Sequence, residues 1–272
     1  MQDNTLEKYS GQAMVVKYGG SAMQSEELKN SVMKDIIELS QAGIKVALVH
    51  GGGPELSSML NKLGKETKFV DGLRYTDEET VGIATMVFAG KINKDLAAHV
   101  YKLGGKAVGV CGIDGGLIKA EKIQDKDLGY VGRIISINTE LLDGLMDSGF
   151  IPIIATVGIG EDGQVYNINA DTAASEIAVA LKADRLVSLS DVRGILRDKD
   201  DASSLISTVT VSEIPSLIES GVIVGGMIPK VEGCIDAMAR GVVETSIIDG
   251  RVPHSIILEL TSDEGIGTLI KK

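Results

Sequence analysis

The sequence of 272 residues predicts an α/β fold in which mainly parallel strands alternate with helical crossovers. Two observations predict it: short apolar runs bounded by Gly, Asp or Pro alternate with longer amphipathic stretches, and glycine-rich segments follow several of the runs. Hydrophobic residues make up 44% of the chain, which is enough for one large core or two modest ones. Open sheets of this kind bind ligands at the carboxyl ends of their strands. We therefore expect functional residues directly after the apolar runs.

Each expected element rests on the spacing of its apolar residues. A short run of consecutive apolar residues is interpreted as a strand, and apolar residues three or four positions apart as one face of a helix. The expected strands are, in chain order, Ala13–Lys17, Lys45–His50, Ala107–Cys111, Pro152–Val157, Leu186–Ser190, Ser246–Asp249 and Ser255–Leu260. The expected helices are Glu26–Ala42, Pro54–Leu63, Asp77–Leu103, Thr139–Ser148, Thr172–Ala183, Val211–Glu219 and Val231–Arg240.

Two helix starts carry local signals. Thr76 and Glu79 have the spacing of a capping box, in which each side chain satisfies a free backbone N–H. Pro229 is suited to a first helical position, which puts Lys230 in the first turn. The helix dipole disfavours a cation there by a few tenths to about 1 kcal/mol unless an anion faces it. Lys230 therefore predicts a bound anion such as phosphate.

The order of elements also indicates a hairpin and a domain boundary. Segment 158–169 holds Asp162 and Gly163 between two short apolar runs, a pattern that favours a hairpin at the sheet edge. The chain has no internal repeat and no long linker. The polar stretch 182–185 is the expected boundary, and it divides the chain into lobes 1–184 and 185–272.

Charge and composition exclude several classes of partner. The formal net charge of −11 argues against nucleic acid or an anionic membrane, because both bind basic surfaces. Cys111 and Cys234 are isolated, so neither a disulfide framework nor a zinc site is predicted. The amino-terminal segment lacks a basic stretch followed by an apolar run, and no apolar stretch approaches the roughly 18 residues of a membrane-spanning helix. We expect a cytoplasmic protein with a small-molecule ligand.

The most specific local motif is His50-Gly51-Gly52-Gly53-Pro54, between a strand and a helix. Three residues without side chains let a ligand approach the backbone closely, and the helix start offers N–H groups to an anion. A tight turn alone would need only one or two glycines. Lys17 ends the first strand, where its ammonium would project from the carboxyl edge of the sheet. Taken alone, a lysine in this position is most often a solvated side chain.

Polar side chains follow two further apolar regions. Asn167, Asn169 and Asp171 stand together before an expected helix. Asp171 alone would be explained as a helix cap, but three polar side chains at alternate positions at the end of an apolar region favour a binding role. Asp191 follows a strand and offers the same two interpretations. Arg74 carries a planar fork that suits two-point contact with a carboxylate.

Two nucleotide-binding signatures do not fit the chain. The sequence contains no Gly-x-x-x-x-Gly-Lys-Ser/Thr, so a P-loop is unsupported. Gly158, Gly160 and Gly163 have the spacing of the dinucleotide fingerprint Gly-x-Gly-x-x-Gly. The residues that follow, 164–167, look extended where that fingerprint requires a helix, which disfavours a nicotinamide-dependent enzyme.

Taken together, six ordered segments resemble the signatures of the acetylglutamate kinases, which are amino acid kinases: 15–20, 50–54, 69–74, 167–171, 190–196 and 226–230. The resemblance covers nearly the whole chain. It implies a three-layer α/β/α sandwich with a mainly parallel central sheet and two lobes, the first for acetylglutamate and dimerisation and the second for the nucleotide. It also implies phosphorylation of the side-chain carboxylate of N-acetyl-L-glutamate with MgATP, an early step of arginine synthesis.

The resemblance assigns roles to residues. It implies that Lys17 and Lys230 neutralise charge on the moving phosphoryl group while Asp171 orients both ammonium groups. The implied acceptor contacts are Gly52, Gly53, Arg74, Asn167 and Asn169. The implied nucleotide contacts are Gly19, Gly20, Ser190, Asp191, Val192, Gly194, Ile195, Ile223, Val224, Gly225 and Gly226. Magnesium is expected to be held largely by ATP oxygens and water, with no protein metal ligands.

Regulation and assembly are implied only in outline. Arginine-inhibited members carry a carboxy-terminal segment like 254–259, followed by one like 265–268, which implies His254, Glu259 and Gly265 as an arginine site. Those members also carry an amino-terminal helix that ties dimers into a hexamer. This chain has a short segment before its first strand, with Thr5 in the place of a tyrosine. A homodimer is implied, whereas a hexamer and inhibition by arginine stay open.

Two other functions stay open at this point. A sibling kinase for glutamate, aspartate, carbamate or a nucleoside monophosphate would use a similar lysine pair with a different acceptor pocket, although the surroundings of Arg74 and Asn167 favour acetylglutamate. A non-catalytic sensor could bind arginine or a nucleotide through the same glycine loops, and it would tolerate the loss of Lys230.

Overall fold

The fold is built around an eight-stranded sheet, seen in a computed structural model that describes residues 4–19, 23 and 25–272. The strand order is β12-β14-β13-β11-β1-β2-β8-β5, and every neighbouring pair is parallel except β13 and β14. The strands are β1 (Ala13–Tyr18), β2 (Lys45–His50), β5 (Ala107–Cys111), β8 (Ile151–Ala155), β11 (Arg185–Ser190), β12 (Thr208–Thr210), β13 (Glu244–Asp249) and β14 (Thr268–Lys271).

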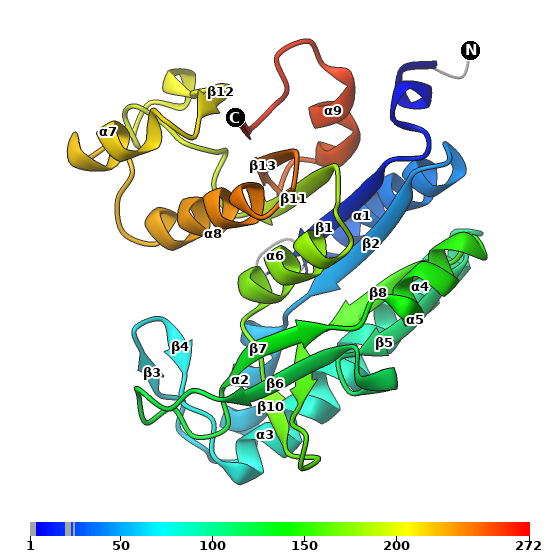
Figure 1. Ribbon diagram of the computed structural model, residues 1–272, viewed down its shortest axis with the longest axis vertical. Helices are drawn as coiled ribbons and strands as arrows, with labels where there is room; N and C mark the ends of the chain where they lie inside the picture. The colour runs from blue at the N-terminus through cyan, green and yellow to red at the C-terminus, as the bar shows by residue number, and fades with distance from the viewer. Residues whose placement is uncertain (1–3, 20–22, 24) are drawn as a thin grey trace.

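Two smaller sheets lie at one end of the main sheet, at the bottom of Figure 1. The first has the order β10-β9-β6-β7, and the second is a two-stranded hairpin. Their strands are β3 (Phe69–Val70), β4 (Leu73–Arg74), β6 (Ile118–Lys122), β7 (Gly132–Ile137), β9 (Val157–Ile159) and β10 (Val165–Asn167).

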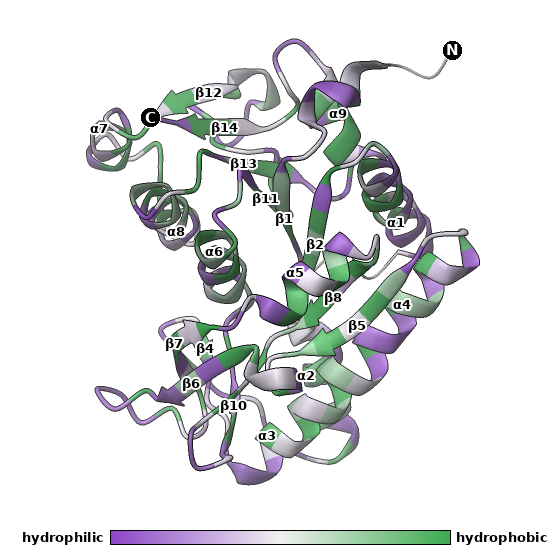
Figure 2. Cartoon of the chain, turned by 45° about the vertical axis from the view of Figure 1, so that its right-hand side comes forward, coloured by the Kyte–Doolittle hydropathy of each residue, from purple (hydrophilic) through white to green (hydrophobic). Residues whose placement is uncertain are grey.

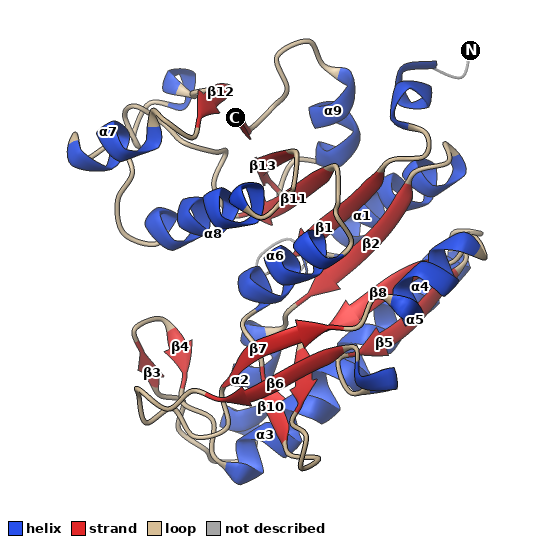
Figure 3. Cartoon of the chain, in the orientation of Figure 1, coloured by secondary structure: helices blue, strands red, loops and turns tan. Residues whose placement is uncertain are grey.

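Helices cover both faces of the main sheet, which gives the three expected layers (Figure 3). α1, α4 and α9 pack on one face, and α5, α6 and α8 on the other. The α-helices are α1 (Glu26–Gln41), α2 (Gly53–Lys62), α3 (Glu78–Thr85), α4 (Asn93–Lys102), α5 (Glu140–Asp147), α6 (Ala170–Ala180), α7 (Ile214–Glu219), α8 (Met227–Ala239) and α9 (Ser255–Thr261). The 3₁₀ helices are η1 (Asn4–Tyr9), η4 (Asp114–Gly116) and η5 (Ala202–Ser204), and η3 (Met86–Ile92) is a π-helix between α3 and α4.

Successive side chains of a strand point to opposite faces of the sheet, so the core is divided into separate clusters. On β1, Met14 and Val16 join the cluster under α1, whereas Val15 joins the cluster under α6. A third cluster contains Val209, Val231 and other residues from segment 195–270, and it lies between α8 and β12–β14. In Figure 2 hydrophobic residues lie along the strands of the main sheet, while hydrophilic residues mark the outer sides of α4 and α8.

One expected strand is wrong. Segment 255–260 forms helix α9, which buries Ser255, Ile256, Glu259 and Leu260. These positions recur with helical spacing, and a short apolar run of this kind fits a strand and a helix equally well by periodicity alone. The other six expected strands are present with their bounds shifted by up to two residues, and the run 152–157 is divided between β8 and β9.

The predicted starts of two helices also need correction. Asp77 caps α3, because its Oδ1 atom accepts a hydrogen bond from the Thr80 backbone N–H at 2.7 Å. Thr76 is fully buried and its hydroxyl donates to the Arg74 carbonyl instead, so the capping box is wrong by one residue. Helix α8 starts at Met227, and Pro229 is therefore its third residue. Lys230 follows as the fourth residue, and the N–H groups of Met227 and Ile228 before it donate to the Val224 and Gly225 carbonyls, both at 3.2 Å.

The hairpin expected in 158–169 is confirmed, because β9 and β10 pair antiparallel around the turn at Asp162. The antiparallel pair β6–β7 and the short strands β12 and β14 were not predicted. Of the helices in the described part of the chain, none combines the length and the apolar character needed to cross a membrane.

Candidate active site

Three charged side chains from distant parts of the chain meet at the carboxyl end of β1. Lys17 lies near the end of β1, Asp171 in the first turn of α6, and Lys230 in the first turn of α8. The Lys17 Nζ atom lies 3.0 Å from Asp171 Oδ1, and the Lys230 Nζ atom lies 3.5 Å from Asp171 Oδ2. One carboxylate thus holds two ammonium groups side by side. We call Lys17, Asp171 and Lys230 the charge triad.

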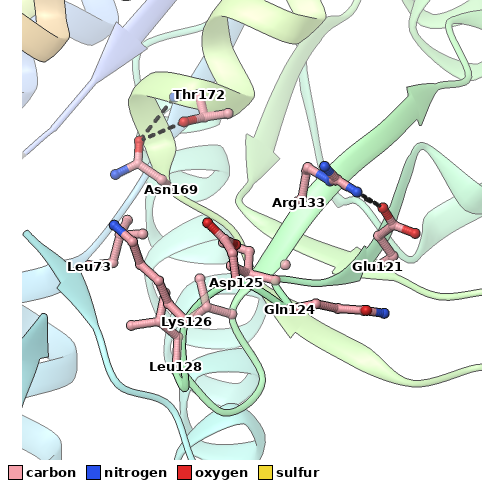
Figure 4. A pocket seen from close by; sticks show the side chains of 12 residues that line it. Leu73, Glu121, Gln124, Asp125, Lys126, Leu128, Arg133, Asn169 and Thr172 are labelled. Carbon is pink, nitrogen blue, oxygen red and sulfur yellow. Dashed lines mark hydrogen bonds and ion pairs between the residues drawn. The ribbon is translucent and has the colours of Figure 1, made fainter. Parts of the chain in front are cut away.

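Asp171 is available for this role because a neighbour caps the helix. The Oδ1 atom of Asn169 accepts hydrogen bonds from the Thr172 backbone N–H at 3.0 Å and from the Thr172 hydroxyl at 3.3 Å (Figure 4). Asn169 is therefore the N-cap of α6. The alternative explanation of Asp171 as a helix cap is wrong.

The surroundings keep Asp171 ionised. Partial burial opposes ionisation, but the ammonium groups of Lys17 and then Lys230 outweigh it and hold the pKa of Asp171 below its ordinary value of 3.8. With both lysines protonated, the charge triad carries a net charge of one positive unit. A net cation at a sheet edge suits an anionic ligand with several oxygens.

A small chamber next to the charge triad is lined by the predicted acceptor residues. It is a cavity of about 200 Å³, and its lining includes Lys17, Arg74, Asn167 and the glycine loop 51–53. Arg74 is buried. Its Nη2 atom donates to the Gly53 carbonyl at 3.0 Å and to the Ser57 hydroxyl at 2.8 Å.

Arg74 is held by two further contacts. Its Nη1 atom donates to the Thr67 hydroxyl at 3.2 Å, and its guanidinium stacks over the Phe69 ring at 4.8 Å from the ring centre. Burial lowers the pKa of Arg74, yet a guanidinium stays charged at every physiological pH. Arg74 therefore adds a fixed, partly desolvated positive charge to the chamber, which Lys17 also lines.

Thr76 links two of the predicted acceptor residues. Asn167 Nδ2 donates to the Thr76 hydroxyl at 3.1 Å, and the same hydroxyl donates to the Arg74 carbonyl at 2.9 Å. Sequence reasoning missed this contact because Thr76 was assigned to a capping box. The signal that could have found it is a polar residue between Arg74 and the true cap, Asp77.

A second cavity of about 420 Å³ shares Lys17 with the chamber and extends along α6 and α8. Its lining includes Asp171, Lys230, Ser188 and Gly226. Of the residues predicted to bind the nucleotide, Gly226 lines this second cavity, and it is the N-cap of α8. Ser188 was not predicted, because it lies inside a strand whose period gives no sign of function.

The other predicted nucleotide residues lie elsewhere. Ile195 and Ile223 are buried in the third cluster, so their side chains belong to the core. Val192 and Val224 are exposed. The Ser190 hydroxyl donates to Asp191 Oδ1 at 3.4 Å just beyond the end of β11. Gly194 lies in the loop after β11, and Gly225 lies in the loop before α8. Gly19 lines the small chamber. Gly20 lies outside the described residues.

The loop 123–131 and the β3–β4 hairpin form the outer wall of the site. Between them lies a cavity of about 610 Å³, drawn in Figure 4, which shares Leu73 and Asn169 with both inner cavities. Lys126 Nζ donates to Asp71 Oδ2 at 2.7 Å and so ties the loop to the hairpin turn.

The residues predicted for arginine divide into two groups. Glu259 Oε2 accepts the backbone N–H groups of Ile266 at 2.8 Å and Gly267 at 3.1 Å, beside Gly265. His254 instead contacts α1, where its Nδ1 atom lies 2.7 Å from Asp35 Oδ1. Burial raises the pKa of Asp35 despite this histidine.

The described residues contain no cluster of three or more His, Cys, Asp or Glu side chains arranged to hold a metal ion. The charge triad has a single carboxylate, and both of its oxygen atoms face lysines. A divalent ion that reaches this site therefore needs most of its oxygen ligands from another source, such as a polyphosphate and water.

Comparison with known proteins places these features in a family context. Residues 12–249 match the model of the amino acid kinase family. A relative named acetylglutamate kinase from Clostridioides difficile (strain 630) is 55% identical over 267 residues, which cover 98% of this chain and 93% of the relative. A second relative of that name, from Brachyspira hyodysenteriae (strain ATCC 49526 / WA1), is 52% identical over 98% of this chain and 93% of its own length.

Among solved structures, N-acetylglutamate synthase from Neisseria gonorrhoeae complexed with coenzyme A and N-acetyl-glutamate matches with a TM-score of 0.85 and 28% identity. The match covers 98% of this chain and 61% of the synthase chain, so this chain spans less than two thirds of that protein.

Proposed function

Because the chain belongs to the amino acid kinase family, and within it to the acetylglutamate kinases, we propose that it transfers the terminal phosphoryl group of ATP to the side-chain carboxylate of N-acetyl-L-glutamate. The product is N-acetylglutamyl 5-phosphate, an intermediate of arginine biosynthesis. The single observation that carries the proposal is the charge triad beside a chamber that holds Arg74.

The chemistry needs no general base. The acceptor carboxylate has an ordinary pKa of about 4.3, so it is already ionised at neutral pH. One of its oxygens forms a bond to the terminal phosphorus, while the bond from that phosphorus to the bridging oxygen breaks and ADP leaves with the electron pair. Catalysis then consists of positioning and of charge stabilisation.

The charge triad supplies that stabilisation. We assign Lys17 and Lys230 to the oxygens of the transferred group and of the leaving phosphate, where negative charge is largest. Asp171 keeps both ammonium groups at fixed positions, within 3.0 Å and 3.5 Å of its oxygens. No reorganisation of the cations is then required when the phosphoryl group moves.

The small chamber suits the acceptor. Arg74 spends two of its five N–H donors on Gly53 and Ser57 and one on Thr67, which leaves donors for the non-reacting carboxylate of acetylglutamate. We assign Gly52, Gly53, Asn167 and Asn169 as the other acceptor contacts. The volume of about 200 Å³ fits a small amino acid derivative and not a nucleotide.

The larger cavity along α6 and α8 suits the phosphates of ATP. We assign the nucleotide to the backbone of 190–195 and 223–226, which lie at the ends of β11 and before α8, together with Gly19 and Gly20. Mg²⁺ enters as the MgATP complex and is carried by phosphate oxygens and water.

Lobe organisation, assembly and regulation complete the proposal. We place acetylglutamate binding and dimerisation in residues 1–184 and nucleotide binding in residues 185–272, in a cytoplasmic homodimer. We also propose that L-arginine acts as an inhibitor near Glu259 and Gly265. Support comes from a second synthase structure, complexed with coenzyme A and L-arginine, that matches this chain with a TM-score of 0.81 and 27% identity.

The test is a coupled assay of ADP release with acetylglutamate, glutamate and aspartate as acceptors, each with and without arginine. We expect turnover with acetylglutamate to exceed turnover with free glutamate. A faster reaction with glutamate or aspartate would assign the chain to a sibling kinase. Tight ligand binding without any ADP release would indicate the non-catalytic sensor.

A further inference from the structure

A buried polar network lies directly beneath the glycine loop, and the proposed chemistry does not use it. His50 and Asn93 are both completely buried. His50 Nδ1 lies 2.8 Å from the Gly51 carbonyl oxygen, and His50 Nε2 lies 3.1 Å from Asn93 Nδ2. The network thus connects the first glycine of the loop to the start of α4.

Main-chain carbonyls of the sheet fix the orientation of the Asn93 amide. The Nδ2 atom also lies 3.1 Å from the Val110 carbonyl oxygen and 2.8 Å from the Ile153 carbonyl oxygen. A flipped amide would direct its oxygen at these two acceptors, so the NH₂ group must face them. Lys94 Nζ donates to Asn93 Oδ1 at 3.1 Å and supports the same orientation.

The orientation of Asn93 in turn fixes the proton on His50. The Asn93 NH₂ group cannot accept a proton from Nε2, and the Gly51 carbonyl can only accept one from Nδ1, so the ring proton sits on Nδ1 and donates to the Gly51 carbonyl. Burial lowers the pKa of His50 to about 4, the bond to Gly51 opposes this shift, and the charge of Lys94 adds to it. The ring is therefore neutral at physiological pH.

The π-helix η3 packs against the glycine loop and directly precedes Asn93. It ends at Ile92, one residue before Asn93. A side chain on Gly52 would meet Ile92 Cδ1 at 2.2 Å and Phe88 Cδ1 at 2.9 Å, so the loop backbone packs tightly on this segment. π-Helical turns inside α-helices recur at functional sites.

We propose that His50 and Asn93 are positioning residues that set the direction of the peptide group between Gly51 and Gly52. The described chain has no cis peptide bond, so the Gly51 carbonyl and the Gly52 N–H point in opposite directions. A carbonyl held toward His50 therefore turns the Gly52 N–H away from the ring and toward the ligand side of the loop. This inference rests on the proposed function, in which Gly52 contacts the acceptor.

Two substitutions of His50 separate this role from simple space filling. His50→Asn retains a donor at the position of Nδ1 and loses the Nε2 acceptor, whereas His50→Gln retains an acceptor at the position of Nε2 and loses the donor to Gly51. We expect His50→Asn to stay within about fivefold of the wild-type kcat. We expect His50→Gln to lose about tenfold or more, with the KM for MgATP changed less than threefold.

If His50 only filled space, kcat would be higher in His50→Gln than in His50→Asn, because glutamine is closer to histidine in size. Equal or higher kcat in His50→Gln would therefore overturn the proposal. Thermal unfolding of both variants checks that each is folded. Lys102→Ala, which removes an exposed side chain at the end of α4, serves as the control.

A second measurement does not depend on activity or on any variant. The chain contains three histidines, so long-range ¹H–¹⁵N correlation spectra of protein labelled on histidine give three resolvable rings. We expect His50 to show a protonated Nδ1 and an unprotonated Nε2, unchanged from about pH 5.5 to 8. A protonated Nε2, or titration in this range, would contradict the inference.

The two measurements also separate the inference from the proposed function. A wild-type protein without phosphoryl transfer would contradict the proposed function, and the tautomer of His50 would then decide the positioning claim alone. Asn93→Asp provides a further check, because acceptors would then face both ring nitrogens and we expect a second ring proton on Nε2; an unprotonated Nε2 in the folded variant would contradict the inferred contact.

Discussion

At the scale of single residues, the division of roles between Asn169 and Asp171 decides what the site can do. Helix α6 needs one side chain to cap its free N–H groups, and Asn169 supplies it. Two residues later, Asp171 is in the first turn with no capping duty, and its carboxylate holds Lys17 and Lys230. If the helix started two residues later, Asp171 would be its N-cap and its carboxylate would no longer be available to pair with Lys17 and Lys230.

Lys230 tests the catalytic assignment. We expect Lys230→Ala to fold, to keep acetylglutamate affinity within a few fold, and to lose on the order of a hundredfold or more in turnover, because it removes one charge-stabilising donor. Steady-state kinetics and acetylglutamate titration measure the two quantities. Near-normal turnover would remove Lys230 from the mechanism.

Asp171 tests the electrostatics of the site through stability. Its pKa is lower in the folded protein than its ordinary value of 3.8, so its stabilising contribution is present above that value and is lost as the pH falls through the lower folded pKa. We expect Asp171→Asn to lower the midpoint of denaturant unfolding at pH 7, by a difference that shrinks below about pH 4. Equal differences at pH 7 and pH 3 would show that the carboxylate is not ion-paired.

The sequence predicted the members of the site better than their partners. Lys230 was singled out because a cation is disfavoured at a helix start, Lys17 because it ends a strand at the ligand-binding edge, and Arg74 because its planar fork suits a carboxylate. Thr76 was missed and the role of Asn93 was left open, because their contacts are with Asn167 and His50, which are distant in sequence. Contacts of this kind exist only after the sheet has formed.

At the scale of elements, the long helical segment 78–102 shows a limit of periodicity. Its apolar spacing predicts one continuous helix, and the chain is helical throughout. The π-helix within it changes the face on which later residues lie, which no average period reveals. The same limit explains α9, where six residues are too few to separate a period of two from one of 3.6.

Helix α5 allows a stability test with a matched pair of glycines. Gly144 is exposed in the helix interior with open space around it, whereas Gly149 follows the helix with φ of 74°. We expect Gly144→Ala to stabilise the protein by about 0.5–1 kcal/mol. Gly149→Ala should destabilise it by about 1 kcal/mol or more, because the left-handed conformation strains a side chain.

Denaturant unfolding of the two variants in parallel checks this prediction. The backbone N–H groups of Gly149 and Phe150 return to the Met146 and Leu145 carbonyls at 3.0 Å and 2.9 Å, so the turn cannot relax without losing bonds. Destabilisation by both variants would mean that packing against α5, and not backbone conformation, governs the site.

At the scale of the whole molecule, the cores do not follow the predicted boundary at 184. β11 pairs with β1, so the main sheet crosses it without interruption. The cluster under α1 includes Val187, Ile248 and Ile256 from the second lobe, whereas the third cluster lies entirely within 195–270. Composition along the chain cannot reveal which face of a strand joins which core, and this part of the organisation was not predictable.

Neighbouring residues of β13 test this shared core. Ile248 packs in the cluster under α1, and Ile247 packs in the third cluster on the opposite face. Each substitution to alanine should cost about 2–5 kcal/mol, because both side chains are fully buried. We expect Ile248→Ala to speed amide hydrogen exchange in α1 and β2, whereas Ile247→Ala should act on α8. Identical exchange patterns would refute the separate cores.

The charge triad is assembled from both packing units. Lys17 and Asp171 belong to β1 and α6, which pack on the clusters under α1 and α6, and Lys230 belongs to α8, which packs on the third cluster. A nucleotide that meets only one of these units faces half of the cations. Since Asp171 joins Lys17 and Lys230 at 3.0 Å and 3.5 Å, a change that separates the two packing units would, under the proposed function, weaken phosphoryl transfer without altering either lysine.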